Sequence, residues 1–280
     1  RENIFIDSDY KIFLIEEDLF FNQYNFHKQK ISFHRSSMKF YEDYLIKKGL
    51  DVSYINSYEK ESSIIELIKN ISNQGYQKIE IYDPVDYLLN RRIKRVSKEL
   101  NIDLVVHESK LFINSNEELK YFFKDSKQKF FQTTFYKSER KKRNILINSK
   151  GGPEGEEWTY DIQNRKKFPK DKAPPEIKNP KKNSYVIESE KYVEKNFHNN
   201  FGSLGLFNYP TTYDEADQWL NQFLNDRFLE FGDYEDAIVK DELTLNHSIL
   251  SPLLNVGLLN IKDLLDISIE FSRVNDIPIN

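Results

Sequence analysis

Short apolar strands that alternate with amphipathic helices dominate the first 107 residues, and this pattern limits the possible folds more than any other feature. The predicted strands are residues 10–15, 52–55, 78–82 and 102–106. The predicted helices between them are residues 33–48, 64–71 and 87–100. Strands separated by helices pair in parallel through right-handed crossovers. The sequence therefore predicts an α/β fold with a Rossmann-like, doubly wound parallel sheet.

Polar residues follow each predicted strand, where such sheets bind their ligands. They are Glu16, Glu17 and Asp18, then Asn56 and Ser57, then Asp83, and finally His107 and Glu108. We expect them to gather at one edge of the sheet, where a small ligand can bind. The sequence contains neither G-x-G-x-x-G nor G-x-x-x-x-G-K-[ST]. This argues against a conventional Rossmann dehydrogenase and against a P-loop enzyme.

The rest of the chain changes in character twice. Ser115 to Glu118 is a capping box that predicts a helix start, and a longer basic helix is predicted over residues 130–146. Glycines and prolines then mark an irregular connector, and helical sequence resumes near residue 185 with a second capping box from Thr212 to Glu215. We predict an α/β domain over residues 1–148, a linker over 149–183 and the start of an all-helical domain over 184–280.

Composition removes several classes of site. The chain has no cysteine, so its residues can form no disulfide and hold no iron-sulfur cluster. Its five histidines lack the spacing of metal ligands, and we expect no metal site. No apolar run approaches the roughly 20 residues that span a bilayer, and the N-terminus lacks the apolar core of a signal peptide. The expected location is the cytoplasm.

Charge is distributed unevenly along the chain. Residues 137–182 hold 14 basic and 7 acidic residues, a local excess of +7 in a chain with a formal charge of −4. Such a basic middle can face nucleic acid. It can equally be a solvated linker that its lysines keep soluble.

The stretch from Asn246 to Leu259 contains a Ser-Pro junction that leads into an apolar helix. Ser251 can cap this helix, and Pro252 suits its first turn. The free amides of the helix start, with donors from His247 and Ser248, can bind a phosphate or pyrophosphate. The alternative is an ordinary capped helix that covers a core.

A second stretch rich in hydrogen-bond donors contains His27 and His34, seven residues apart. It can receive a polar or anionic group, or it can be a helix start that faces solvent. The many acidic pairs are expected by chance in a chain with 45 acidic residues. Ser248 beside His247 is no nucleophile arrangement, and G-x-S-x-G is absent.

The order of these parts resembles the photolyase/cryptochrome family. Residues 247–259 are similar to its flavin-binding T-S-x-L-S-P-x-L-x-x-G segment, with His247 in place of the threonine, and Tyr234 matches a tyrosine that reaches the same flavin. Residues 26–38, 135–142 and 158–166 resemble one branch, the prokaryotic photolyase-related proteins that include bacterial 6-4 photolyases.

The resemblance implies a flavoprotein with FAD bound in the helical domain. Light would drive electron transfer from the reduced flavin to a damaged pyrimidine pair flipped out of DNA. By position, the residues implied to hold the flavin phosphates and ribityl chain are Tyr234, His247, Ser248, Ile249, Leu250 and Ser251. They bind the cofactor and carry no catalytic role. A second, ribityl-lumazine-type antenna is also implied, but Phe20 occupies the position of its acidic ligand.

Compared with the family, the sequence is truncated at both ends. In the family, the segments that enclose the isoalloxazine ring, face the lesion and hold the cluster cysteines follow the position of Pro278, so the sequence resembles either a fragment of a photolyase-like protein or a shortened relative. In full-length form we expect a DNA photolyase that repairs either 6-4 or cyclobutane lesions. The alternative is a non-catalytic, cryptochrome-like photoreceptor or a DNA- or ligand-binding remnant. The sequence does not indicate an oligomeric state.

Overall fold

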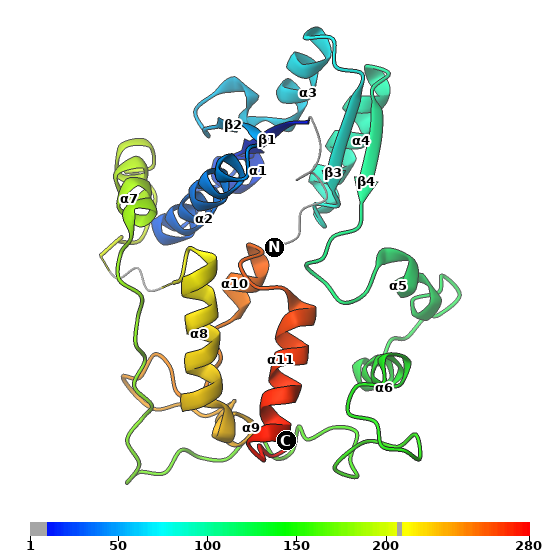
Figure 1. The fold of residues 1–280 in the computed structure, drawn as a ribbon, viewed down its shortest axis with the longest axis vertical. Coiled ribbons are helices and arrows are strands. Elements are labelled where there is room, and N and C mark those ends of the chain that lie inside the picture. The colour runs from blue at the N-terminus through cyan, green and yellow to red at the C-terminus, as the bar shows by residue number, and fades with distance from the viewer. Residues whose placement is uncertain (1–9, 206–208) are drawn as a thin grey trace. The chain divides into compact units, whose positions relative to one another are not determined.

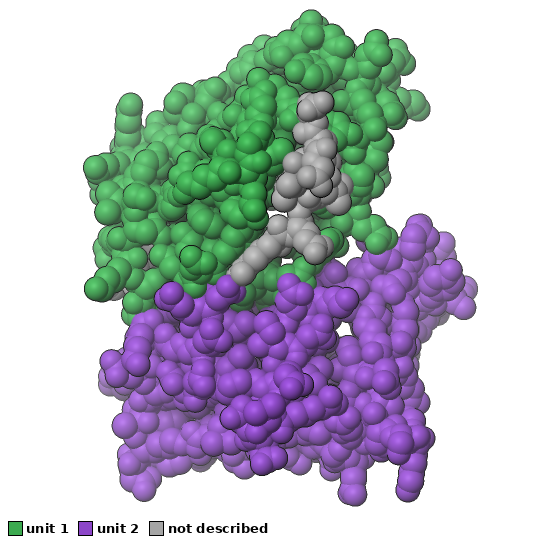
Figure 2. Space-filling view, in the orientation of Figure 1, with its two compact units in different colours: residues 1–111, 179–216, 252–260 green, residues 112–178, 217–251, 261–280 purple. Residues whose placement is uncertain are grey.

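The structure is a computed structural model, which describes residues 10–205 and 209–280. The apolar stretch at residues 3–6, which precedes the first predicted strand, lies outside the described residues. Two compact units are present (Figure 2). Unit 1 contains Arg1–Leu111, Asn179–Ala216 and Pro252–Asn260. Unit 2 contains Phe112–Lys178, Asp217–Ser251 and Ile261–Asn280.

The four predicted strands all form in unit 1 (Figure 1). Strand β1 (Lys11–Ile15) pairs in parallel with β2 (Asp51–Ile55), and β3 (Lys78–Tyr82) pairs in parallel with β4 (Asp103–His107). The α/β class and the parallel pairing are therefore confirmed. Within the described residues the strands form two separate two-stranded sheets, whereas the sequence predicted one continuous sheet. Its doubly wound arrangement stays a prediction.

The helices of unit 1 include those predicted over residues 64–71 and 87–100 and from residue 185. The helix predicted over 33–48 begins five residues earlier, and the short helices at residues 18–21 and 60–62 were not predicted. In chain order the helices are α1 (Asp18–Phe21), α2 (Lys28–Lys47), η1 (Lys60–Ser62), α3 (Ile64–Asn73), α4 (Tyr87–Glu99) and α7 (Ser184–Asn196). Helix α2 ends where predicted, because Gly49 takes a φ of +84°, which glycine adopts without strain. The apolar faces of α3 and α4 meet in a core that includes Ile68, Ile93 and Val96.

Unit 2 contains short helices and long irregular segments. Its elements are α5 (Asn116–Phe122), α6 (Gln132–Arg143), η2 (Phe228–Glu230), α9 (Phe231–Tyr234) and α11 (Ile261–Val274). The Ser115 capping box is present, with both of its hydrogen bonds. Residues 144–183 form no helix and only one isolated bridge, between Ile147 and Pro153, as an irregular connector requires.

Two further helices have residues in both units. Helix α8 (Tyr213–Asp226) begins at the second predicted capping box, where Thr212 Oγ1 accepts a bond from the Glu215 amide at 3.3 Å. Helix α10 (Ser251–Asn255) is shorter than predicted. The division into domains at residues 148 and 183 stays a prediction. Across the described residues, every helix is too short or too polar to cross a membrane.

Candidate functional site

The residues before α10 form a constrained loop in unit 2. The His247 ring accepts a hydrogen bond at Nδ1 from the Leu245 amide, at 3.1 Å, and Leu250 is buried. Ile249 has a φ of +55°, in the left-handed region that β-branched residues avoid. Backbone strain of this kind costs roughly 1–3 kcal/mol and concentrates at functional sites. Seven other described non-glycine residues, including the β-branched Val85, also have a positive φ, so the strain supports the choice of this loop but does not by itself identify a site.

A buried arginine holds the start of the loop. Arg227, just after α8, is 1% exposed. Its Nε donates to the His247 carbonyl oxygen at 3.2 Å, and its Nη1 donates to the Gln222 side chain at 3.1 Å. The Asn246 amide group in turn donates to the Arg227 carbonyl oxygen at 3.4 Å. These bonds fix residues 246 and 247 against the C-terminal end of α8.

Among the described residues no carboxylate forms an ion pair with the guanidinium of Arg227. Burial lowers the pKa of Arg227, and the charge of the neighbouring Asp226 opposes this shift in part. Its Nη2 and the nearby Asn246 Oδ1 are buried without a hydrogen-bond partner. Buried polar groups are nearly always satisfied, and an unpaired buried charge is costly. Such a site is suited to an anion.

Tyr234 lies at the end of α9, beside the connector of the same unit. Its ring centroid is 5.1 Å from that of Phe168, and Lys172 Nζ is 5.4 Å from the Tyr234 ring. Lys172 also pairs with Glu230. Within the described residues the Tyr234 hydroxyl has no hydrogen-bond partner, so it is available to a ligand.

The start of α10 differs from the prediction. Ser251 is the first residue of the helix rather than its cap, and it is exposed. A helix of five residues has a weak dipole, since the dipole sums over aligned peptide units. The helix start alone is therefore a weak anion site, and Arg227 supplies the stronger charge.

The expected gathering of polar residues at the strand ends occurs in part. Glu16, which follows β1, is fully buried, and four donors reach its carboxylate. Oε1 accepts from Arg35 at 2.5 Å and Tyr54 at 2.8 Å, and Oε2 accepts from the Ser57 amide at 2.8 Å and Tyr192 at 2.7 Å. Asn56 joins through Arg35 at 2.9 Å. The cluster is satisfied internally, so it has no group left for a ligand.

Arg35 connects this cluster to α7. Its Nη2 donates to Glu188 Oε1 at 2.7 Å, and its guanidinium lies 3.5 Å from the Tyr192 ring centroid. Burial lowers the pKa of Arg35, but the bond to Glu188 and the charge of Glu16 outweigh this effect and raise it overall. The cluster therefore fastens α7 to α2 and to the ends of β1 and β2.

The strand ends of the other sheet form a separate group. The Asp83 amide donates to the His107 carbonyl oxygen at 2.8 Å, and the His107 ring lies 2.8 Å from Glu80. The two sheets are not paired with each other, and the expectation that all four strand ends share one site stays a prediction.

The two histidines of the donor-rich stretch have structural positions. His27 caps α2, where its Nδ1 accepts from the Gln29 amide at 3.1 Å. His34 lies between the rings of Phe21 and Phe33, and burial together with Lys30 lowers the pKa of His34 to about 4. A neutral His34 and a capping His27 do not favour an anion, so the solvent-facing or structural interpretation is preferred. Phe20 packs between two apolar clusters and offers no carboxylate to an antenna.

Part of the basic excess is paired with acidic residues of the same unit. The pairs in unit 2 are Lys142 with Glu118, Arg143 with Glu118 and Glu139, Arg165 with Asp236, Lys166 with Asp233, and Lys172 with Glu230. Lys137 and Lys141 lie 6.0 and 5.0 Å from the Trp158 ring centroid. This pairing favours a folded connector over an unpaired electropositive surface.

Sequence analysis assigned neither Arg227 nor Arg35 to a site, although helical periodicity indicates that both are buried. Arg227 follows Leu220 by seven residues and Phe223 by four, so the helical periodicity of α8, continued by one residue, places it on the buried side. Arg35 follows Ile31 by four residues in the same way. A cation on an apolar helix face indicates a buried charge, but the sequence cannot show what compensates it.

Comparison with known proteins shows the family. The model of a family described as deoxyribodipyrimidine photo-lyase-related protein matches residues 3–209. A (6-4) photolyase of Agrobacterium fabrum is 28% identical over 248 residues, which are 85% of this chain and 47% of that protein. The uncharacterized protein R852 of Acanthamoeba polyphaga mimivirus is 35% identical over 163 residues, 56% of this chain and 82% of that protein. The chain thus spans about half the length of the photolyase that it matches.

Proposed function

Because the chain belongs to the deoxyribodipyrimidine photolyase-related family, we propose that it is part of a photolyase-like flavoprotein that holds FAD through the loop before α10. The observation that carries this proposal is the uncompensated guanidinium of Arg227, buried beside His247. A diphosphate is the group in FAD that such a charge would stabilise.

Each residue of the proposed site has a role set by its chemistry. Tyr234 would donate its hydroxyl hydrogen to a phosphate oxygen, and Ser248 and Ser251 would donate theirs to the phosphate or ribityl chain. His247 Nδ1 already accepts a bond, which leaves Nε2 as the ring atom that can donate. The strained Ile249 and the buried Leu250 would hold the backbone so that its amides face the cofactor.

Bound FAD would supply light-driven electron transfer, while these residues bind and orient it. We propose damaged DNA as the substrate of the full-length protein, by analogy with the family and with the (6-4) photolyase that the chain resembles. The competing proposal is a non-catalytic photoreceptor or DNA- or ligand-binding form. The internal pairing of the basic residues in unit 2 supports it, since phosphate contacts require unpaired cations.

A flavin titration followed by a repair assay tests the proposal. We expect added FAD to be retained by the protein through gel filtration and to show a perturbed flavin absorbance spectrum. Light-dependent reversal of a lesion in an oligonucleotide would favour the photolyase. DNA binding that ignores the lesion and falls steeply with salt would favour the alternative. A protein that retains no FAD contradicts the proposed site.

A further inference from the structure

Helices α5 and α6 and the loop that joins them have no apolar core of their own (Figure 1). Among residues 112–143 of unit 2 the only buried residue is Arg140. The apolar face of a helix is normally buried against another element. Here several aromatic side chains remain in contact with solvent instead. They are Tyr121, which is 79% exposed, Phe123 (42%), Phe130 (49%) and Phe131 (63%).

The rings of this segment contact one another rather than a core. The ring centroid of Phe123 lies 5.1 Å from those of Phe122 and Phe130 and 5.4 Å from that of Phe135. All three pairs are tilted or edge-to-face, and none is stacked with parallel rings. Ring surface is therefore left accessible to a flat partner.

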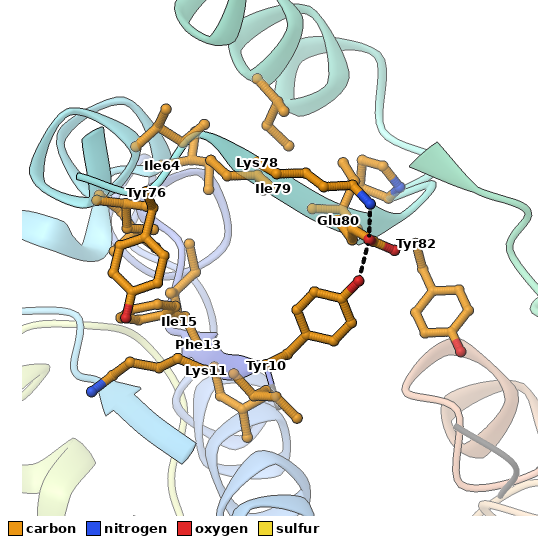
Figure 3. A pocket seen from close by; sticks show the side chains of 18 of the residues that line it. Tyr10, Lys11, Phe13, Ile15, Ile64, Tyr76, Lys78, Ile79, Glu80 and Tyr82 are labelled. Atoms are coloured by element: carbon orange, nitrogen blue, oxygen red, sulfur yellow. Dashed lines mark hydrogen bonds and ion pairs between the residues drawn. The ribbon is translucent and has the colours of Figure 1, made fainter. Parts of the chain in front are cut away.

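An exposed aromatic residue of unit 1 shows how such a side chain can be held by polar bonds alone. The Tyr10 hydroxyl donates to Glu80, and Lys78 Nζ lies 2.6 Å from the same carboxylate (Figure 3). Phenylalanine has no hydroxyl. The exposure of Phe130 and Phe131 therefore has no comparable explanation.

The exposed aromatic residues alternate with lysines. Residues 120–131 contain four lysines and one acidic residue, Asp125. Lys120 forms an ion pair with Glu117. Within the described residues no carboxylate pairs with the other three, which are Lys124, Lys127 and Lys129. The segment therefore combines accessible rings with uncompensated positive charge.

We propose that this surface binds single-stranded nucleic acid. We call it the α5–α6 surface, and its residues are Tyr121, Lys124, Lys127, Lys129, Phe123, Phe130 and Phe131. The rings would stack on bases, and the lysines would contact the phosphates of the same strand. In a duplex the base faces are covered by neighbouring base pairs, so only an unpaired strand can use the rings. The proposal requires neither a flavin nor a lesion, and it applies to the photolyase and to the non-catalytic form alike.

Two other anionic partners match the surface less well. A helix that lies on a membrane presents one continuous apolar face. Here exposed polar residues lie between the rings in sequence, namely Ser126, Gln128, Gln132, Thr133 and Thr134. An acidic polypeptide would compensate the lysines, but its carboxylates cannot stack on the rings. The alternation of rings, lysines and polar residues therefore favours a nucleic-acid strand.

Fluorescence anisotropy tests the surface in the dark and without added FAD, so the result does not depend on the proposed flavin site. The probes are labelled, undamaged oligo(dT) and oligo(U) of about 20 residues, longer than the roughly 4–16 nucleotides of typical single-strand sites. The same oligo(dT) in a duplex with oligo(dA) is the third probe.

Two double variants address the rings. Tyr121→Ser/Phe131→Ser removes the two most exposed rings of the α5–α6 surface. The matched control is Tyr58→Ser/Tyr87→Ser, which removes two equally accessible rings from unit 1. We expect Tyr121→Ser/Phe131→Ser to weaken single-strand binding at least tenfold and the control to leave it unchanged, because stacking on each ring contributes to affinity.

A third double variant addresses the charge. Lys124→Gln/Lys129→Gln should flatten the slope of log Kd against log salt by about 1.4, since each phosphate contact to a single strand contributes ~0.7. For the native chain we expect at least one of the two single strands to bind at least tenfold more tightly than the duplex. The preferred single strand then identifies DNA or RNA as the partner.

Three outcomes overturn the proposal. The first is equal single-strand affinity of the native chain and Tyr121→Ser/Phe131→Ser, with circular dichroism showing both folded. The second is a duplex that binds as tightly as either single strand. The third is binding of phosphatidylserine vesicles or of polyglutamate without binding of either single strand, which would assign the surface to a lipid or to an acidic polypeptide.

Discussion

Two buried arginines, one in each unit, differ in the partners that their charges have. Arg35 contacts the carboxylates of Glu16 and Glu188 and the face of Tyr192. Arg227 donates to a carbonyl and to a neutral amide side chain and lies 5.7 Å from the Phe223 ring centroid, but its Nη2 has no hydrogen-bond partner in the described part of unit 2. Both guanidiniums lie close to loops that sequence analysis selected as possible ligand sites.

The difference indicates a structural role for Arg35 and a ligand-binding role for Arg227. A buried charge with its full set of partners is a structural lock, because any ligand would have to displace existing bonds. A buried charge without a counterion loses hydration and gains little in return, unless a ligand compensates it. The Arg35 cluster therefore explains how α7 docks, and Arg227 identifies where an anion would be stabilised.

The largest expected effect is at Arg35. Arg35→Met leaves Glu16 charged and buried without its cation, and breaking such a pair costs about 3–5 kcal/mol of unfolding free energy. Urea unfolding followed by circular dichroism measures the change. The control is Arg165→Met, which removes an exposed pair with Asp236 at 3.7 Å and should cost about 0–1 kcal/mol. A loss below about 1 kcal/mol for Arg35→Met would mean that the cluster is not a lock.

His34, which precedes Arg35 in the sequence, is buried in its uncharged form. The pKa of His34 falls from 6.5 to about 4, so the unfolded chain binds a proton that the folded chain does not between these values. Stability is then independent of His34 above pH 6.5 and decreases by up to about 3 kcal/mol as the pH falls to 4. His34→Gln should flatten urea-midpoint profiles over this window. Equal slopes in the variant and the native chain would refute the assignment.

Arg227→Met should weaken FAD binding and change stability little, whereas Arg35→Met should mainly lower stability. We expect FAD affinity to fall about 10- to 100-fold, since hydrogen bonds to charged groups contribute about 1.5–3 kcal/mol. The unfolding free energy of the FAD-free protein should fall by about 1 kcal/mol or less, because no buried carboxylate is left unpaired. Fluorescence titration and urea unfolding measure the two quantities. A stability loss as large as that of Arg35→Met, with FAD affinity unchanged, would make Arg227 another lock.

The smallest expected effect is at Tyr234. Tyr234→Phe removes a hydroxyl that has no partner in the described structure, so stability should not change, and FAD affinity should fall about fivefold, or ~1 kcal/mol. Tyr160→Phe is the matched control, because its hydroxyl donates to the Gly155 carbonyl oxygen at 2.7 Å. It should lower stability and leave FAD affinity unchanged. If the two variants behave alike, Tyr234 does not reach the cofactor.

Local features of the fold were predictable because local chemistry determines them. The four strands, the end of α2 at Gly49 and both capping boxes follow from periodicity, glycine conformation and reciprocal hydrogen bonds within four residues. Pairing between distant segments was less accessible. The separation into two sheets and the contact of Arg35 with Glu188, 153 positions away, depend on tertiary packing that no local pattern encodes.

The candidate site shows the same limit. The resemblance selected the loop from His247 to Ser251, but helical patterning did not predict that α10 stops at Asn255 or that Ile249 takes a positive φ. It also placed Arg227 on a buried face without showing that its charge lacks a partner. Compensation of a buried charge is a property of the three-dimensional surroundings, and only the structure supplied it.

The most direct test of the uncompensated charge is FAD titration of the native chain and the Arg227→Met variant under identical conditions, followed by flavin fluorescence. The account predicts saturable binding to the native chain and at least tenfold weaker binding to the variant, with both proteins equally folded by circular dichroism. Equal affinities, or no saturable binding to either protein, would contradict the claim that Arg227 and the loop before α10 form the flavin phosphate site.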